Sequence, residues 1–62
     1  MNENYFEELN KALLGKECSI LGKKYWFMCF YMGERVPMVM LKEQETYRVV
    51  ILLLSNSLEL AF

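Results

Sequence analysis

Residues 25–32 have the sequence YWFMCFYM, eight apolar or aromatic side chains without interruption. Aromatic residues are enriched in β-strands, so this segment predicts a strand. Successive side chains of a strand point to opposite faces, and a strand with one face in water therefore alternates apolar and polar residues. Because this segment does not alternate, we expect both faces of the strand to be covered in the working protein.

Strand and turn patterns continue on both sides of this segment. Further strands are predicted at about 18–21, 36–42, 46–54 and 58–62. Turns are predicted between them at 22–24, 33–34 and 43–45. Gly33-Glu34 suits a two-residue hairpin loop, which predicts antiparallel pairing of the strands on either side.

The N-terminal segment has a helical period instead. Phe6, Leu9 and Leu13 form one apolar stripe, which predicts a helix at about 4–14. Gly15 follows at the position where glycine commonly ends a helix. We therefore expect an α+β fold in a single domain, with one N-terminal helix packed on a four- to five-stranded antiparallel β-meander.

The expected hairpins assign side chains to faces. A two-residue loop at 33–34 places Trp26 opposite Leu41, and a short second turn places Lys42 opposite Thr46. The helix is then expected to cover the face formed by Trp26, Met28, Phe30, Met32, Val39, Leu41, Tyr47, Val49, Ile51 and Leu53. The second face would carry Tyr25, Phe27, Cys29, Tyr31, Val36, Met38, Met40, Lys42, Arg48, Val50, Leu52 and Leu54. Both faces are apolar, and one short helix covers only one of them.

The composition makes this second face difficult to leave in water. The chain has 62 residues, of which 55% are hydrophobic, and a domain of this size buries only about 60% of the surface of its unfolded chain. Small domains usually add disulfides, a metal or oligomerisation. Cys18 and Cys29 are too few for a disulfide framework, and without His or Asp they cannot complete a zinc site. We expect no cofactor and no metal, which leaves oligomerisation.

The second face is therefore predicted to be a self-association or partner surface, because interfaces are enriched in aromatic residues, Met and Arg. Its candidate residues are Tyr25, Phe27, Tyr31, Met38, Met40, Lys42, Arg48, Val50 and Leu52. The basic residues Lys23, Lys24 and Arg35 lie at predicted strand ends and are candidates for a rim that orients a partner.

Two other functions use the same residues. Aromatic side chains with basic neighbours can stack single-stranded bases, as in a nucleic-acid-binding regulator, but the net charge of −1 disfavours that function. A structural subunit docked permanently in a larger complex is the other alternative. An enzyme is not expected, because Cys29 has no histidine to activate it and no phosphate-binding or nucleophile motif occurs.

The sequence thus predicts a small non-enzymatic interaction module that forms a homodimer and binds or inhibits a larger macromolecule. We expect a complete small protein in the cytoplasm, with reduced cysteines, no signal peptide and no membrane-spanning segment. In size and style only, it resembles the small inhibitors that phages and mobile elements direct against bacterial enzymes and defence systems.

Overall fold

The computed structural model describes residues 3–57 and 59–62 and has one helix followed by strands. The elements are α1 (Glu3–Leu13), β1 (Glu17–Ile20), β2 (Lys23–Met32), β3 (Pro37–Glu43), β4 (Val49–Leu53), the 3₁₀ helix η1 (Leu54–Asn56) and β5 (Leu60–Ala61). The predicted α+β fold, a helix packed on an antiparallel sheet, is confirmed. The predicted last strand includes Leu58, which lies outside the described residues.

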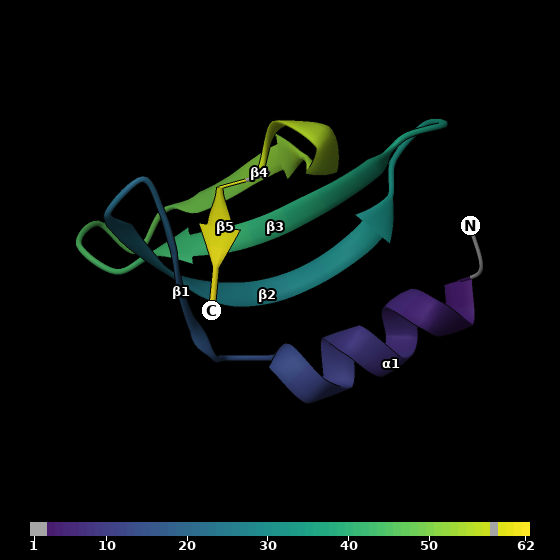
Figure 1. The fold of residues 1–62 in the computed structure, drawn as a ribbon, viewed down its shortest axis with the longest axis horizontal. Coiled ribbons are helices and arrows are strands. Elements are labelled where there is room, and N and C mark those ends of the chain that lie inside the picture. Colours follow the sequence, from purple (N-terminus) through teal and green to yellow (C-terminus); the bar gives the residue numbers. More distant parts are fainter. Residues whose placement is uncertain (1–2, 58) are drawn as a thin grey trace.

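The five strands form one antiparallel sheet in the order β4-β3-β2-β1-β5. β1 to β4 follow one another as a meander, whereas β5 returns to pair with β1. β1 and β5 cross in front of β2 and β3 in Figure 1, and the ring of Phe62, directly after β5, lies 5.6 Å from that of Phe27 in β2. The sheet therefore curls over, and its own last strand helps to cover one of its faces.

The β2–β3 hairpin differs from the expected two-residue loop. Met32 pairs with Pro37, and Gly33–Val36 form a wider loop closed by a 2.8 Å hydrogen bond from the Gly33 N–H to the Val36 carbonyl. Close packing favours glycine at position 33, since a Cβ there would lie 2.8 Å from Cγ of Met38 and would force that side chain to shift. A β-bulge at Met28 then shifts the register between Phe27 and Cys29. Compared with the pairing expected from the sequence, the bulge moves the β2 side chains that precede it to the opposite face of the sheet.

The β3–β4 connection is also longer than expected. Lys42 pairs with Val49 rather than with Thr46, a slip of three residues that moves every β4 side chain to the opposite face. The Tyr47 N–H bonds to the Glu43 carbonyl, and the Thr46 hydroxyl donates to the Glu43 carboxylate at 2.6 Å. These bonds favour a wide loop, in which Tyr47 adopts a left-handed φ of 60°.

The core lies on the inner face of the curled sheet. Phe27, Val39 and Leu41 are its fully buried side chains, and Cys18 and Tyr25 complete the buried cluster. The side chains packed around this cluster are Leu13, Ile20, Phe30, Val50, Leu52 and Leu60. The helix reaches the core through buried Phe6, whose ring lies 5.9 Å from that of Phe30.

Strand β2 is longer than β1, so part of its edge has no strand partner. Helix α1 lies along this part of the edge (Figure 1). The Asn10 side-chain amide donates to the Phe30 carbonyl at 3.0 Å and accepts from the Phe30 N–H at 2.7 Å, as a neighbouring peptide group would. Next to it, the Gly15 N–H bonds to the Phe27 carbonyl, and the Phe27 N–H bonds to the Lys16 carbonyl. Gly15 has a φ of +79° and ends the helix as predicted.

The β1–β2 turn holds a strained residue. Leu21 and Gly22 have φ of 49° and 86°, values typical of a two-residue type I′ turn, and Leu21 is 83% exposed. Leu21→Asn should raise the free energy of unfolding by about 1 kcal/mol, because asparagine adopts the left-handed region more readily. Thermal unfolding followed by circular dichroism measures this effect. Leu21→Ala is the control, since it removes the exposed side chain but keeps the strain; equal melting temperatures for the two variants would contradict the explanation.

Candidate protein interaction surface

The sheet surface that faces away from the core is called the outer face here. The pairing places its side chains in three rows across β2, β3 and β4. The rows are Trp26-Lys42-Val49, Cys29-Met40-Ile51 and Tyr31-Met38-Leu53. Lys42 is the only charged residue in these rows, so the second face of the sheet is apolar, as the sequence predicted.

Exposure on the outer face is greatest on β4. Val49, Ile51 and Leu53 are 51%, 50% and 37% exposed, whereas the β2 and β3 members of the rows are half-buried among their neighbours. Together the rows form a continuous apolar surface, and large exposed apolar patches often bind a partner. The outer face therefore combines a packed centre with an open apolar border on β4.

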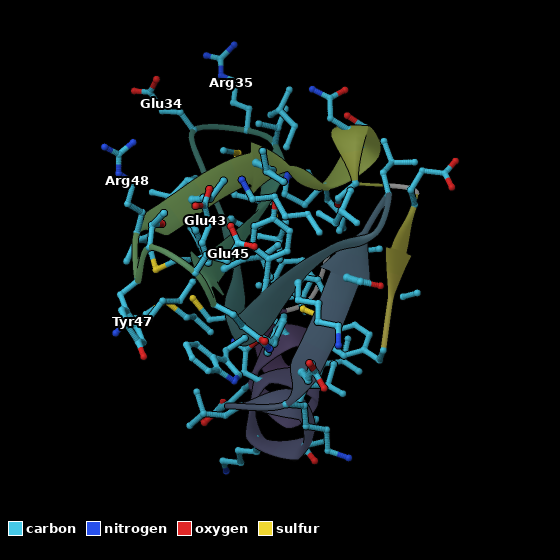
Figure 2. All side chains as sticks on the ribbon, turned by 90° about the vertical axis from the view of Figure 1, so that its left-hand side faces the viewer. Glu34, Arg35, Glu43, Glu45, Tyr47 and Arg48 are labelled. Atoms are coloured by element: carbon cyan, nitrogen blue, oxygen red, sulfur yellow. The ribbon has the colours of Figure 1, made fainter. Side chains whose placement is uncertain are left out.

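Tyr47 extends the outer face at the Trp26 end. Its ring stacks on that of Trp26, with centroids 5.7 Å apart and planes 20° from parallel, and the Lys42 ammonium lies 5.7 Å from the Tyr47 centroid. Tyr47 is nevertheless 65% exposed. Figure 2 shows Tyr47 and Arg48 projecting from the loop that precedes β4. A left-handed aromatic residue held by stacking is a feature found more often at functional sites than elsewhere.

The Glu43 carboxylate contacts both the loop that carries Tyr47 and the start of β2. It accepts a hydrogen bond from the Thr46 hydroxyl and forms an ion pair with Lys23 at 3.2 Å. The Thr46 hydrogen bond, followed by the Lys23 ammonium, lowers the pKa of Glu43, and the same contact raises the pKa of Lys23. These contacts join the loop that carries Tyr47 to the start of β2 and the end of β3.

Two of the three predicted rim residues form ion pairs with neighbouring carboxylates. Lys23 pairs with Glu43, and the Lys24 ammonium lies 3.7 Å from the Glu17 carboxylate. Arg35 is exposed in the loop between β2 and β3, with a φ of 97°. Figure 2 looks along the long axis of the molecule, so the Arg35 loop in it lies behind the Tyr47 loop, at the far end of the sheet.

The predicted face residues divide into two groups. The structure brings Tyr31, Met38, Met40 and Lys42 together on the outer face, as expected, and places Arg48 in the exposed loop before β4. The remaining members, Tyr25, Phe27, Val50 and Leu52, lie on the inner face instead. Their assignment to an open face is therefore corrected: the Met28 bulge turns Tyr25 and Phe27 inward, and the three-residue slip of β4 does the same to Val50 and Leu52.

The same two shifts expose residues that the sequence assigned to the core. Trp26, Tyr47, Val49, Ile51 and Leu53 were expected beneath the helix, and all five lie outside the buried cluster. The uninterrupted apolar runs give no local signal for the choice, since either set of alternate residues in 49–54 could face inward. The polar loop at 43–48 was the available clue, because it has room for more than a short turn.

The two thiols have different surroundings. Cys18 is buried, and burial, with the nearby Glu17 carboxylate, raises the pKa of its thiol. Cys29 lies in the middle row of the outer face. Within residues 3–57 and 59–62, no group of three or more His, Cys, Asp or Glu side chains lies close enough to hold a metal. In the same ranges, no helix is long and apolar enough to cross a membrane.

No protein-family model, curated protein or solved structure matches the sequence or the fold.

Proposed function

We propose that this protein is a non-enzymatic interaction module that self-associates and uses its apolar outer face to bind, and thereby inhibit or recruit, a larger macromolecular partner. The observation that carries the proposal is the outer face itself, with eight apolar side chains and one lysine in three cross-strand rows. Burying each large apolar side chain gains about 1.5–3 kcal/mol, so covering this face stabilises any assembly that does so.

The chemistry of the surface favours a protein partner. Trp, Tyr and Met are enriched in the cores of protein interfaces, where charged residues are depleted. Methionines adapt their shape to a partner, and Met38 and Met40 occupy the central strand of the outer face. The single Lys42 ammonium lies beside Tyr47, where it is placed to fix the orientation of a partner carboxylate.

The nucleic-acid alternative has less support. The Trp26 and Tyr47 rings already stack on each other, so neither presents two free faces to a base. Lys23 and Lys24 already have carboxylate partners. Binding through phosphate contacts would weaken steeply as salt is raised, whereas an apolar interface would not. Two further hypotheses about this chain stay predictions: that it is a subunit docked permanently in a larger complex, and that it is an inhibitor of phage or mobile-element origin.

Ile51→Lys tests the proposal at the centre of the exposed β4 row. The side chain is half-exposed and outside the core, so the variant should fold with an unchanged circular dichroism spectrum. It should lose self-association at least tenfold, because a charge must then be buried in the interface. The measurement is the weight-average mass by sedimentation equilibrium.

Leu21→Lys is the matched control, since it adds the same charge at an exposed leucine in the β1–β2 turn. It should associate as the wild type does. If Ile51→Lys associates as strongly as the control, the outer face at β4 takes no part in self-association.

A further inference from the structure

Strand β4 is an open edge of the sheet. It is the terminal strand in the order β4-β3-β2-β1-β5 and has the sequence VVILL, without a charge, a proline or a glycine. Natural proteins protect exposed edges with charged residues, proline, bulges or a covering element, because unpaired backbone groups otherwise recruit another strand. None of these devices occurs within Val49–Leu53.

The other edges of the sheet, within the described residues, are either covered or very short. Beyond β1, the edge of β2 is closed by α1, where Asn10 and Lys16 satisfy the backbone groups of Phe30 and Phe27. The far edge of the sheet is β5, which has only two residues. The contrast indicates that β4 is left open for a partner strand.

The hydrogen-bond pattern shows which groups β4 presents. The Glu43 N–H donates to the Arg48 carbonyl at 2.8 Å, which makes these two residues a hydrogen-bonded pair of the antiparallel ladder. Such pairs alternate with non-hydrogen-bonded pairs along the strands. Val50 and Leu52 therefore bond to β3, whereas Val49 and Ile51 direct their N–H and carbonyl groups away from the sheet. Leu53 directs its N–H the same way, and as the N-cap of η1 it uses its carbonyl in that helix. These three residues also have the most exposed side chains of the three cross-strand rows.

We infer that β4 pairs antiparallel with β4 of a second copy about a two-fold axis at Ile51, so that two five-stranded sheets become one continuous sheet. The inference rests on the proposed self-association and specifies its geometry. Ile51 then pairs with Ile51 of the second copy, and Val49 with Leu53. The central Ile51 pair exchanges two hydrogen bonds. Leu53 is also the N-cap of η1, where its carbonyl accepts the first bond of that helix, so we count only its N–H as a bond to Val49. No like charges oppose one another.

The expected interface is small but sufficient. One paired edge with its flanking apolar side chains buries on the order of 1,000 Å² in total, which is near the lower limit for a specific interface. We therefore expect a reversible dimer that dissociates on dilution. The two outer faces lie side by side in this arrangement, which doubles the apolar surface and leaves Met40, on the strand next to the edge, uncovered for the larger partner.

Single cysteines test both the surface and the register, in a Cys29→Ser background that retains buried Cys18. Ile51→Cys should form an intermolecular disulfide on mild oxidation, because hydrogen-bonded pairs have Cα atoms about 5.5 Å apart, within the range that a disulfide spans. Val49→Cys alone should cross-link at least tenfold more slowly, since its two copies lie four residues apart along the paired strands, roughly 13 Å. A mixture of Val49→Cys and Leu53→Cys should form heterodimers.

Met40→Lys supplies a second, independent readout. The edge pairing predicts that this variant keeps the wild-type dimer, whereas face-to-face stacking of two outer faces predicts a monomer. Equal cross-linking of Ile51→Cys and Val49→Cys, or a monomeric Met40→Lys, would overturn the edge pairing but leave self-association intact. A wild-type protein that stays monomeric at every concentration would overturn self-association and the edge pairing together.

Discussion

Replacing Phe27 with alanine is expected to remove a large part of the free energy of unfolding. Phe27 is 1% exposed, and its ring lies 4.8 Å from that of Phe30 and 5.6 Å from that of Phe62. A buried Phe→Ala change costs about 3–5 kcal/mol. At the usual stability of roughly 0.05–0.15 kcal/mol per residue, a 62-residue chain has about 3–9 kcal/mol in total. The loss is therefore comparable with the whole stability.

Urea unfolding followed by circular dichroism and tryptophan fluorescence measures this effect. Phe62→Ala is the matched control, because it removes the same ring from a position that is 56% exposed; it should cost less than half as much. A Phe27→Ala variant with the wild-type unfolding midpoint would contradict the fold, because it would mean that Phe27 lies on an open face.

Replacing Asn10 with alanine is expected to lower the free energy of unfolding by about 2 kcal/mol, because two half-buried backbone groups of Phe30 lose their partners. A decrease in the free energy of unfolding is informative, because alanine has the higher helix propensity and would otherwise stabilise α1. The melting temperature should fall by roughly 10 °C, at 4–8 °C per kcal/mol for a domain of this size. Hydrogen exchange should show lost protection at the Phe30 amide.

Asn10→Asp separates the hydrogen bonds from packing. At neutral pH its carboxylate can accept from the Phe30 N–H but repels the Phe30 carbonyl, so this variant should also be destabilised. Folding then raises the pKa of the introduced carboxyl above its unfolded value, and the destabilisation should fade as the pH falls through the folded pKa, where the protonated group can donate again. Melting curves for both variants between pH 7 and pH 4 test this. An Asn10→Asp variant that gains nothing relative to Asn10→Ala on acidification would show that the amide bridge is unimportant.

The helix and the strands could be predicted because each has its own local signal. The stripe of Phe6, Leu9 and Leu13 gives the helix, and the glycine-containing or polar turns give the strand boundaries to within a few residues. The apolar character of both sheet faces was also predictable, because the segment 25–32 has no polar positions to turn toward water. That property is independent of register.

The identity of the outer residues could not be predicted, because it depends on two shifts with no local signature. A bulge inside a uniformly apolar strand removes the alternation that would locate it, so Phe27 and Trp26 exchange faces. The loop before β4 is wider than the expected turn, and the left-handed Tyr47 in it stacks on Trp26 from another strand. A contact of this kind has no signature in the local sequence, and the wider loop exchanges the faces of Val50 and Ile51.

Self-association, which the roles inferred for β4 and its apolar border require, is measured by light scattering of the wild-type protein across a dilution series. We predict a mass near twice the 7.4 kDa of one chain at high micromolar concentration, falling toward that of one chain on dilution. The transition should change little between low and high salt, since the interface is apolar. A mass of one chain at every concentration, from a protein that remains folded, would contradict the claim.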